Sequence, residues 1–316
     1  MEAVPAERAP AAVTVVVVSH NTCGYVGRCL ESVRGDCEHI IVVDNASTDG
    51  TVEFLREHVG TVEVLALSEN SGYGTAANRG VALAQSPFVL VLNADAWGLP
   101  GALARLLSAA ERNPKLGLLA PRLLNQDGSS QRSVFGYPAT PLALASWIAA
   151  PGLVTGVFRG WRATQSLFAG RRGHAADVEP IEGQDFPAGA ALLVRKEAWD
   201  EAEGFDEAFF MYSEETDLCR RLRRLGWKVE LCPAAEFVHV GGASTSEVRG
   251  AMRREQLRSY LRYFAKHHGL EQAERARRLV SGAVRLRALV LHGDERAGHR
   301  ALAGWLRGTS VEALLR

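Results

Sequence analysis

The sequence predicts an α/β fold, with a mostly parallel sheet flanked by helices on both faces and a helical C-terminal extension. Three observations support this prediction. Short apolar runs rich in β-branched residues recur along the first third of the chain, and stretches with helical spacing separate them. From about residue 246 the pattern is helical and strongly basic. Strands that alternate with helices favour a parallel sheet, because each crossover helix packs on a face of the sheet.

The elements of the first third follow from this alternation. An uninterrupted apolar run predicts a strand buried on both faces, whereas apolar residues three or four apart predict a helix. The predicted strands are 14–19, 39–44, 61–67 and 88–92, and the predicted helices are 24–33, a segment after the turn at 45–50, a segment ending near 84, and 100–112.

The second half has a different pattern. GAALLVR (189–195) predicts a strand, and the stretch after Gly204 begins with acids and becomes a helix that contains Leu218 and Leu222. Short strand-like pieces follow at 228–233 and 236–242. In the C-terminal helical region, an apolar stripe lies beside arginines. The stripe is Leu257, Tyr260, Leu261 and Phe264, and the arginines are Arg253, Arg254, Arg258 and Arg262.

The composition excludes an intrinsically disordered chain. The 316 residues are 47% hydrophobic and 23% charged, which is typical of a folded chain with a sizeable core. The net charge is zero, but residues 249–316 hold 15 of the 36 basic side chains and only 6 of the 36 acidic ones. This basic tail predicts either an anionic partner or a solvated arginine-rich face.

The cysteines and the uncharged stretches indicate the cellular compartment of the protein and whether the chain crosses a membrane. The five cysteines are odd in number and show no C-x-x-C spacing, so we expect a reducing, cytoplasmic compartment. Residues 1–12 are rich in Pro and Ala, carry acids, and are expected to form a flexible leader. Residues 133–158 carry no charge, but three prolines interrupt them, so a packed or membrane-touching insertion is favoured over a membrane span.

Polar groups follow all four predicted strands of the first third. They are Ser19-His20-Asn21, Asp44-Asn45, Ser68-Glu69-Asn70 and Asn93-Ala94-Asp95. Ligands of parallel sheets bind at the carboxyl ends of the strands, so we expect these residues to border a binding site.

Two interpretations of this site compete. GYGTAA (72–77) fits the dinucleotide fingerprint G-x-G-x-x-A, with Asp95 as the later acid. However, the fingerprint belongs to the first strand–helix turn, and this is the third. The alternative is a sugar-nucleotide site in which Asp95, in the motif N-A-D, holds a hard divalent cation that neutralises a diphosphate.

The combination of motifs resembles the family 2 inverting glycosyltransferases of the GT-A fold, a Rossmann-like sheet flanked by helices. The motifs are SHN, DNASTDGT, NSGYGTAANRG and NAD after successive strands, and later EETD and HVGG. The resemblance covers about residues 13–245 and is closest to the rhamnosyltransferase-like branch, at GFDEAFFMYSEETDLCRRLRRLGWKV. It implies a GT-A domain over 13–245 with an acceptor-side insertion at 133–180, followed by a basic helical extension over 246–316.

The resemblance also implies residue roles. Asp44 would accept from the pyrimidine ring N–H, and Arg79 would lie near the diphosphate. Asp95 and His239 would be the protein ligands of a Mg²⁺ or Mn²⁺ ion. The donor nucleotide as a whole would be bordered by Ser19, His20, Asn21, Asp44, Asn45, Asp49, Gly72, Asn78, Arg79, Asn93, Ala94 and Asp95.

The acids at 214–217 would carry the catalysis. Inversion needs one carboxylate that removes the proton of the attacking hydroxyl. The family usually has Glu-Asp where this chain has Glu214-Glu215, so Glu215 is the first choice for the base and Glu214 the second. Asp217 would cap the helix or orient an acceptor hydroxyl. A plainer interpretation is that all three acids stabilise a helix N-terminus.

The expected function is therefore a metal-dependent inverting glycosyltransferase. Its donor would be a dTDP- or UDP-sugar, with dTDP-rhamnose as the first choice, and its acceptor a glycan or lipid-linked sugar. The alternatives are an NAD(P)-binding Rossmann protein and an inactive sugar-nucleotide-binding protein, the latter because of Asn93 and Glu215. Nucleic acid is not an expected partner. For the basic tail, two accounts are left open. The apolar stripe at 257–264 and its arginines would contact the inner face of the cell membrane, or the stripe would pack on the domain while the arginines face water or a second subunit.

Overall fold

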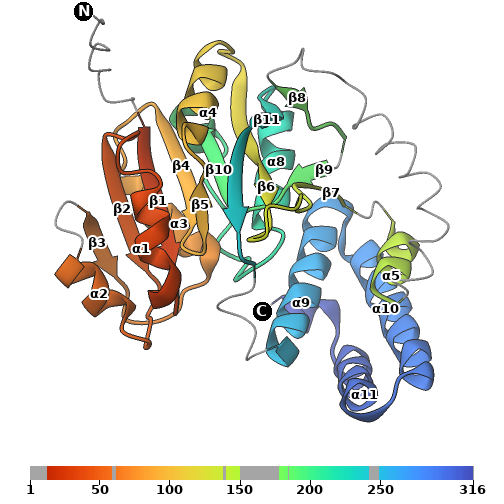
Figure 1. The fold of residues 1–316 in the computed structure, drawn as a ribbon. Helices are drawn as coiled ribbons and strands as arrows, with labels where there is room; N and C mark the ends of the chain where they lie inside the picture. Colours follow the sequence, from red (N-terminus) through yellow and green to blue (C-terminus); the bar gives the residue numbers. More distant parts are fainter. Residues whose placement is uncertain are drawn as a thin grey trace, which may run out of the picture. The chain divides into compact units, whose positions relative to one another are not determined.

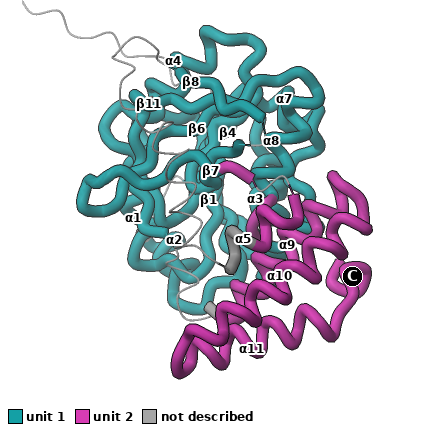
Figure 2. Tube along the Cα trace, turned by 90° about the vertical axis from the view of Figure 1, so that its right-hand side faces the viewer, with its two compact units in different colours: residues 1–135, 177–210, 214–247 teal, residues 136–176, 211–213, 248–316 magenta. Residues whose placement is uncertain are grey.

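The computed structural model describes residues 13–58, 62–137, 140–149, 178–183, 185–241 and 249–315. The predicted leader at 1–12 and residues 138–139 and 150–177 of the predicted insertion lie outside these ranges. The chain divides into two compact units (Figure 2). Unit 1 comprises residues 1–135, 177–210 and 214–247, and unit 2 comprises 136–176, 211–213 and 248–316.

Unit 1 is an α/β unit built on one large sheet (Figure 1). Its strands are β1 (Val13–Ser19), β2 (His39–Asp44), β3 (Glu63–Ala66), β4 (Phe88–Asn93), β5 (Ala96–Gly98), β6 (Leu116–Leu124), β8 (Glu179–Pro180), β10 (Ala191–Arg195) and β11 (Lys228–His239). Its helices are α1 (Cys23–Glu31), α2 (Thr51–His58), α3 (Tyr73–Leu83), α4 (Ala102–Glu111), α7 (Lys196–Glu201) and α8 (Glu214–Arg224). A separate small sheet pairs β7 (Val134–Gly136) with β9 (Asp185–Pro187).

The strand order of the large sheet is β3-β2-β1-β4-β10-β6-β11-β5, with β8 paired to β11. The first four strands in this order are parallel, as the sequence predicts. β10 runs antiparallel to both β4 and β6, and β11 is parallel to β6 but antiparallel to β5. The register sets Ser19 opposite Asp44 and Val18 opposite Asn93, so the carboxyl ends of β2, β1 and β4 form one rim.

Both faces of this sheet are buried, which explains the uninterrupted apolar runs. Val13, Val15 and Val17 of β1 pack in one core cluster with α1 and α4. Val16 and Val18 point the other way into a second cluster with α3, α7 and α8. Leu218 and Leu222 of α8 are fully buried there, as predicted.

Unit 2 is helical. It contains α5 (Pro141–Ala149), α9 (Arg249–His268), α10 (Leu270–Val290), α11 (Gly293–Gly308) and α12 (Val311–Leu314). Among the described residues, no helix is long and apolar enough to cross a bilayer.

The structure corrects one interpretation of the tail. The α9 stripe was considered as a membrane-facing surface, but Leu257, Tyr260, Leu261 and Phe264 are all buried. Tyr137 packs against Tyr260 and Phe264 with ring centroids 5.9 and 6.0 Å apart. The competing prediction is therefore confirmed for α9, because its apolar stripe is part of a protein core.

Candidate active site

Two loops interlock at the ends of β1 and β2. The backbone N–H of Asn21 donates to Ser47 Oγ (2.8 Å), and the N–H of Thr48 donates to Asn21 Oδ1 (2.8 Å). His20 Nδ1 lies 2.8 Å from the carbonyl of Asn45. Asn21 and Ala46 have φ of 51° and 61°. Such values are uncommon for residues other than glycine, and strained backbone of this kind clusters at binding sites.

The acids of these loops are held by the backbone. Asp44, which is 1% exposed, accepts from the N–H of Ser47 at 2.9 Å. Asp49 accepts from the N–H of Cys23 at 2.9 Å and from the N–H of Thr51 at 3.1 Å. Burial would raise the pKa of Asp49, but the hydrogen bonds from Thr51 and Cys23 outweigh it and lower the pKa. Both residues therefore shape the loops. Ser47, which contacts both Asn21 and Asp44, was not identified from the sequence.

The Gly-rich stretch at the start of α3 packs against the chain itself. Gly72 has φ of 87°, and a Cβ there would lie 2.4 Å from the carbonyl oxygen of Phe210. A Cβ on Gly74 would lie 3.1 Å from the side chain of Phe205. Close packing against residues 205–210 thus accounts for both glycines, which removes the support that GYGTAA gave to a dinucleotide site.

Three residues near this stretch, Asn45, Asn78 and Arg79, differ in their contacts. Asn45 Nδ2 donates to Asn70 Oδ1 (2.9 Å) and to the Gly72 carbonyl (3.1 Å), which ties the second loop to the third. Asn78 is engaged with the segment after α7, because its Nδ2 donates to the Phe205 carbonyl (2.8 Å) and its Oδ1 accepts from the Phe205 N–H (2.9 Å). Its hydrogen bonds thus favour a structural role over nucleotide contact. Arg79 is exposed.

Asp95 and His239 converge from sequence positions far apart. Antiparallel pairing sets His239 of β11 opposite Ala96 of β5, directly after Asp95. The N–H of Val240 donates to the Asp95 carbonyl at 3.1 Å, which fixes the backbone. His239 Nε2 then lies 3.5 Å from Asp95 Oδ1, and both side chains are largely buried.

A third residue, Gln131, determines which nitrogen of His239 carries a hydrogen. Gln131 Nε2 donates to the His239 carbonyl (3.0 Å) and to Asn125 Oδ1 (3.1 Å), so two oxygens fix the orientation of the amide. Its Oε1, an acceptor, lies 2.9 Å from His239 Nδ1. Nδ1 must therefore donate, and in the neutral ring Nε2 carries a lone pair that faces Asp95. Burial lowers the pKa of His239, although the charge of Asp95 opposes this, so the neutral ring is favoured.

Two lone pairs that face each other across 3.5 Å repel, and a bound cation between them would turn this repulsion into attraction. A neutral imidazole and a carboxylate are common metal ligands, and a histidine ligand usually donates its other N–H to an oxygen. No group of three or more His, Cys, Asp or Glu gathers in the described ranges. The pair thus fits a site with two protein ligands that is open to donor oxygens.

The acids at the start of α8 differ from one another. Glu214 is 6% exposed, and its Oε2 has no hydrogen-bond partner among the described residues. Burial, followed by the charge of Glu215, raises the pKa of Glu214 well above its ordinary value, which favours the protonated form. Glu215 is half-buried and lies beside Gly189, where an added Cβ would be 3.8 Å from its Cγ.

Gly189 connects Glu215 to the rim. The next residue, Ala190, accepts from the N–H of Asn93 at 2.9 Å, and the Tyr73 hydroxyl donates to the Gly189 carbonyl at 3.2 Å. Burial raises the pKa of Tyr73, and the charges of Glu214, Glu215 and Asp95 raise it further. All three acids thus act on one phenol. Tyr73 was not identified from the sequence, since nothing in its local pattern separates it from a core tyrosine.

Other predicted residues support this arrangement from within the protein. Asp217 is fully buried and pairs with Arg221 Nε at 2.7 Å. Arg221 also donates to the carbonyls of Ala202 and Gly204. This ion pair favours a structural role for Asp217, different from the predicted helix cap, over contact with an acceptor. Ser19 and Ala94 are buried at the rim, and the N–H of Ala94 donates to the Val18 carbonyl at 3.2 Å.

Comparison with known proteins places this site in context. Residues 14–138 match the family model Glycosyl transferase family 2, and residues 172–293 match Glycosyl transferase family group 2. An N-acetylglucosaminyl-diphospho-decaprenol L-rhamnosyltransferase of Mycobacterium tuberculosis is 34% identical over 252 residues, which are 73% of this chain and 76% of the relative. The rhamnosyltransferase WbbL of Escherichia coli is 24% identical over 265 residues, 80% of this chain and 93% of the relative.

Solved structures support the same fold. The mannosyltransferase PcManGT from Pyrobaculum calidifontis, in complex with GDP-Man and Mn²⁺, aligns with a TM-score of 0.53 and 17% identity, over 99% of this chain and 87% of that one. Residues 1–349 of TarS from S. aureus align with a TM-score of 0.50 and 14% identity, over 94% and 92%. The predicted GT-A fold, with its central mostly parallel sheet, is thereby confirmed.

Proposed function

This chain belongs to glycosyl transferase family 2 and is a glycosyltransferase, and from that premise we propose that it transfers rhamnose, with inversion, from a pyrimidine nucleotide diphosphate. The observation that carries the proposal is the convergence of Asp95 and His239 at the rim where the loops after β1 and β2 also meet. The names of the two rhamnosyltransferase relatives support the choice of sugar.

The proposed donor site follows the rim. The loops that carry His20, Asn21, Asp44, Asn45 and Asp49 would enclose the base, and Asn93 and Arg79 would lie along the nucleotide. Each oxygen of Asp44 has two lone pairs, so after the hydrogen bonds from Ser47 its carboxylate still has lone pairs that could accept from a ring N–H. We also propose a reducing, cytoplasmic compartment, because the five cysteines are odd in number and show no C-x-x-C spacing.

Asp95 and His239 would hold a Mg²⁺ or Mn²⁺ ion, and the Mn²⁺ in the PcManGT complex supports a divalent cation. Such an ion would neutralise the charge of the departing diphosphate. On the acceptor side, Glu215 would take the proton of the attacking hydroxyl, since it is the more accessible of the two glutamates. The name of the Mycobacterium tuberculosis relative supports a lipid-linked sugar as the acceptor.

A screen of donors tests this function. Purified protein is incubated with dTDP-rhamnose, UDP-sugars and GDP-mannose, each with Mn²⁺ or with EDTA, and released nucleotide diphosphate is measured. We expect metal-dependent hydrolysis of the dTDP-sugar, followed by faster turnover when a lipid-linked acceptor is added. Hydrolysis of the GDP-sugar alone would exclude the pyrimidine donor, and binding of every donor without release would favour the inactive-protein alternative.

Gln131 provides a second test, because the tautomer of His239 depends on it. Without the acceptor Oε1, the ring can place its hydrogen on Nε2 and bond Asp95 directly, which would occupy the metal site. We expect Gln131→Leu to weaken Mn²⁺-dependent binding of dTDP by about 10- to 100-fold, the usual effect of losing a partner behind a metal ligand. Titration calorimetry measures the affinity, and ¹⁵N chemical shifts of the His239 ring report the tautomer.

The control variants separate this effect from loop damage. Gln131→Glu keeps an acceptor next to Nδ1 but loses the two hydrogen bonds that Nε2 donates, so it should keep the tautomer of His239 and retain more of the affinity than Gln131→Leu does. Arg132→Leu changes the next residue, which donates to the Val134 carbonyl (3.0 Å) and does not touch His239. Equal affinity in Gln131→Leu and wild type, with an unchanged ring tautomer, would show that Gln131 has no part in the metal site.

A further inference from the structure

The large apolar side chains that are exposed are unevenly distributed over the described part of the chain. Only two, Leu83 and Leu225, belong to unit 1. The others belong to unit 2, where Leu142 lies on α5 and the remaining five are on the single helix α10. These five are Leu270, Leu279, Leu286, Leu289 and Val290. Scattered exposed leucines need no explanation, whereas apolar residues gathered on one helix indicate an interaction surface.

Four of these residues lie on one side of α10 together with three arginines. We define the outer face of α10 as Arg275, Arg278, Leu279, Gly282, Arg285, Leu286, Leu289 and Val290, all of which are exposed. Their spacing of three or four residues, with neighbours at 278–279, 285–286 and 289–290, follows the helical repeat. At the C-terminal end of this face, Leu286, Leu289 and Val290 are 68%, 66% and 73% exposed.

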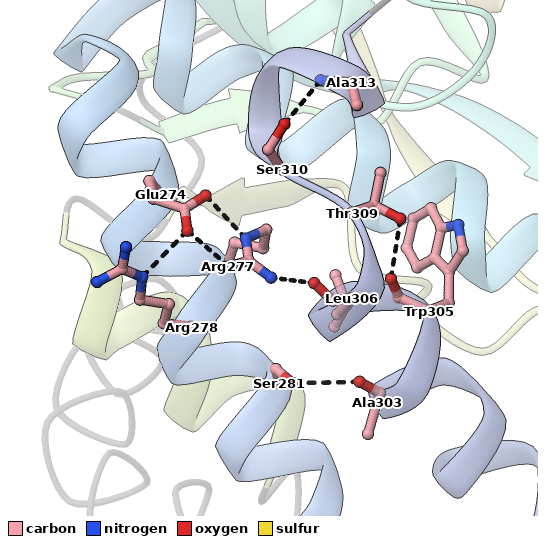
Figure 3. Close-up of polar contacts among 10 residues, drawn as sticks. All are labelled: Glu274, Arg277, Arg278, Ser281, Ala303, Trp305, Leu306, Thr309, Ser310 and Ala313. Carbon is pink, nitrogen blue, oxygen red and sulfur yellow. Dashed lines mark hydrogen bonds and ion pairs between the residues drawn. The ribbon is translucent and has the colours of Figure 1, made fainter.

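The opposite side of α10 is fixed to its own unit. Arg277 donates to the Leu306 carbonyl of α11, and Ser281 Oγ donates to the Ala303 carbonyl at 3.2 Å (Figure 3). Hydrogen bonds from Arg277 lower the pKa of Glu274 to about 2, so this pair is charged at neutral pH. Because α10 is held through its inner side, its outer face does not result from a loosely packed helix.

The arginines of α10 indicate what kind of partner its outer face binds. Between Glu274 and Asp294 the chain has no acidic residue, but it has five arginines, at 275, 277, 278, 285 and 287. On the outer face, Arg275 and Arg278 form ion pairs with Glu271 and Glu274, at 2.7 and 3.0 Å, so the charge that faces a partner lies at Arg285, next to Leu286. Aliphatic side chains beside such an arginine suit the boundary of an anionic bilayer, where the aliphatic chains enter the acyl region and the guanidinium group reaches phosphates. A second copy of the same face would bring these arginines against one another, which like-charge repulsion opposes.

We propose that the outer face of α10 binds an anionic membrane surface, with the helix lying along the bilayer. This inference concerns a surface within unit 2 and does not depend on the proposed function of unit 1. It also replaces the α9 stripe, which is buried, as the membrane-contacting surface.

Co-sedimentation with vesicles tests the proposal. Wild-type protein should sediment with phosphatidylcholine vesicles that contain phosphatidylglycerol, remain in the supernatant with phosphatidylcholine alone, and be released by added salt. The double variant Leu286→Gln/Leu289→Gln should lose most of the binding. Arg285→Gln should reduce the partition coefficient about fivefold, the effect of one basic residue near an anionic surface.

The chain offers matched controls. Leu83→Gln/Leu225→Gln makes the same change at two exposed leucines of unit 1, and Arg300→Gln removes an exposed arginine of α11. Both should bind vesicles like wild type, and all variants should share its melting temperature. Equal binding by Leu286→Gln/Leu289→Gln and wild type would overturn the proposal. It would also be overturned if light scattering showed a wild-type dimer that this variant converts to a monomer, because the face would then be a subunit interface.

Discussion

Glu215→Gln is expected to reduce sugar transfer by about 10²- to 10⁴-fold, the usual contribution of a general base, while affinity for the donor is retained. The substitution keeps the shape of the side chain and removes its basicity. Glu215 is half-buried beside Gly189, next to the segment that accepts the Asn93 N–H, so its carboxylate lies near the rim, with one oxygen, Oε2, buried. Single-turnover transfer, measured alongside titration of the donor, separates the chemical step from binding.

Glu214→Gln is the matched control for this prediction. The raised pKa of Glu214 favours its protonated form, and a glutamine imitates a protonated glutamate in shape and charge. We therefore expect Glu214→Gln to lose much less activity than Glu215→Gln. If Glu214→Gln is the inactive variant, Glu214 is the catalytic base in place of Glu215. If both variants remain active, the acids serve only to stabilise the N-terminus of α8.

Glu215→Asp tests the departure of this chain from the usual Glu-Asp pair. Shortening the side chain moves the carboxylate by about one C–C bond, and a misplacement of about 1 Å can cost 10²-fold in rate. Loss of activity in Glu215→Asp would show that this site is built around the longer side chain.

The parallel strands and the rim were predictable because burial on both faces leaves a clear trace in the sequence. HIIVVD (39–44) is a strand over the predicted residues, and Asp44 ends it at the rim. β6 was missed, since Pro121 interrupts its apolar run and proline argues against a strand interior. Nothing local indicates that β10 inserts antiparallel between β4 and β6, because that order depends on packing across the whole sheet.

The site also contains residues that a local sequence pattern reveals and residues that only contacts between distant parts of the chain reveal. Asp95 is visible in the sequence because a buried strand runs directly into it. Gln131 has no such signal, because its partner His239 is 108 residues away along the chain. The role predicted for Asn78 rested on the resemblance, whereas its hydrogen bonds to Phe205 could be found only in the structure.

Asp95→Asn is expected to abolish Mn²⁺- or Mg²⁺-dependent binding of the nucleotide diphosphate without lowering the melting temperature of the unliganded protein. The carboxylate oxygen faces the lone pair of His239 Nε2 at 3.5 Å, and no shared hydrogen stabilises this contact. An asparagine amide can donate to that lone pair, so the substitution exchanges a repulsion for a hydrogen bond. Retained or higher stability with loss of metal binding is the behaviour of a group kept for function.

His239→Ala completes the test of the metal site. A neutral imidazole is a weaker partner than a carboxylate for hard cations, so this variant should reduce the metal-dependent affinity for dTDP less than Asp95→Asn does. Calorimetric titration with dTDP, in Mn²⁺ and in EDTA, gives the affinities, and thermal unfolding without ligand gives the stabilities. The site would be disproved if Asp95→Asn bound dTDP with the same metal dependence as wild type. A large fall in the unliganded melting temperature of Asp95→Asn would instead show that Asp95 supports the fold, because the contact with His239 would then be attractive without any metal.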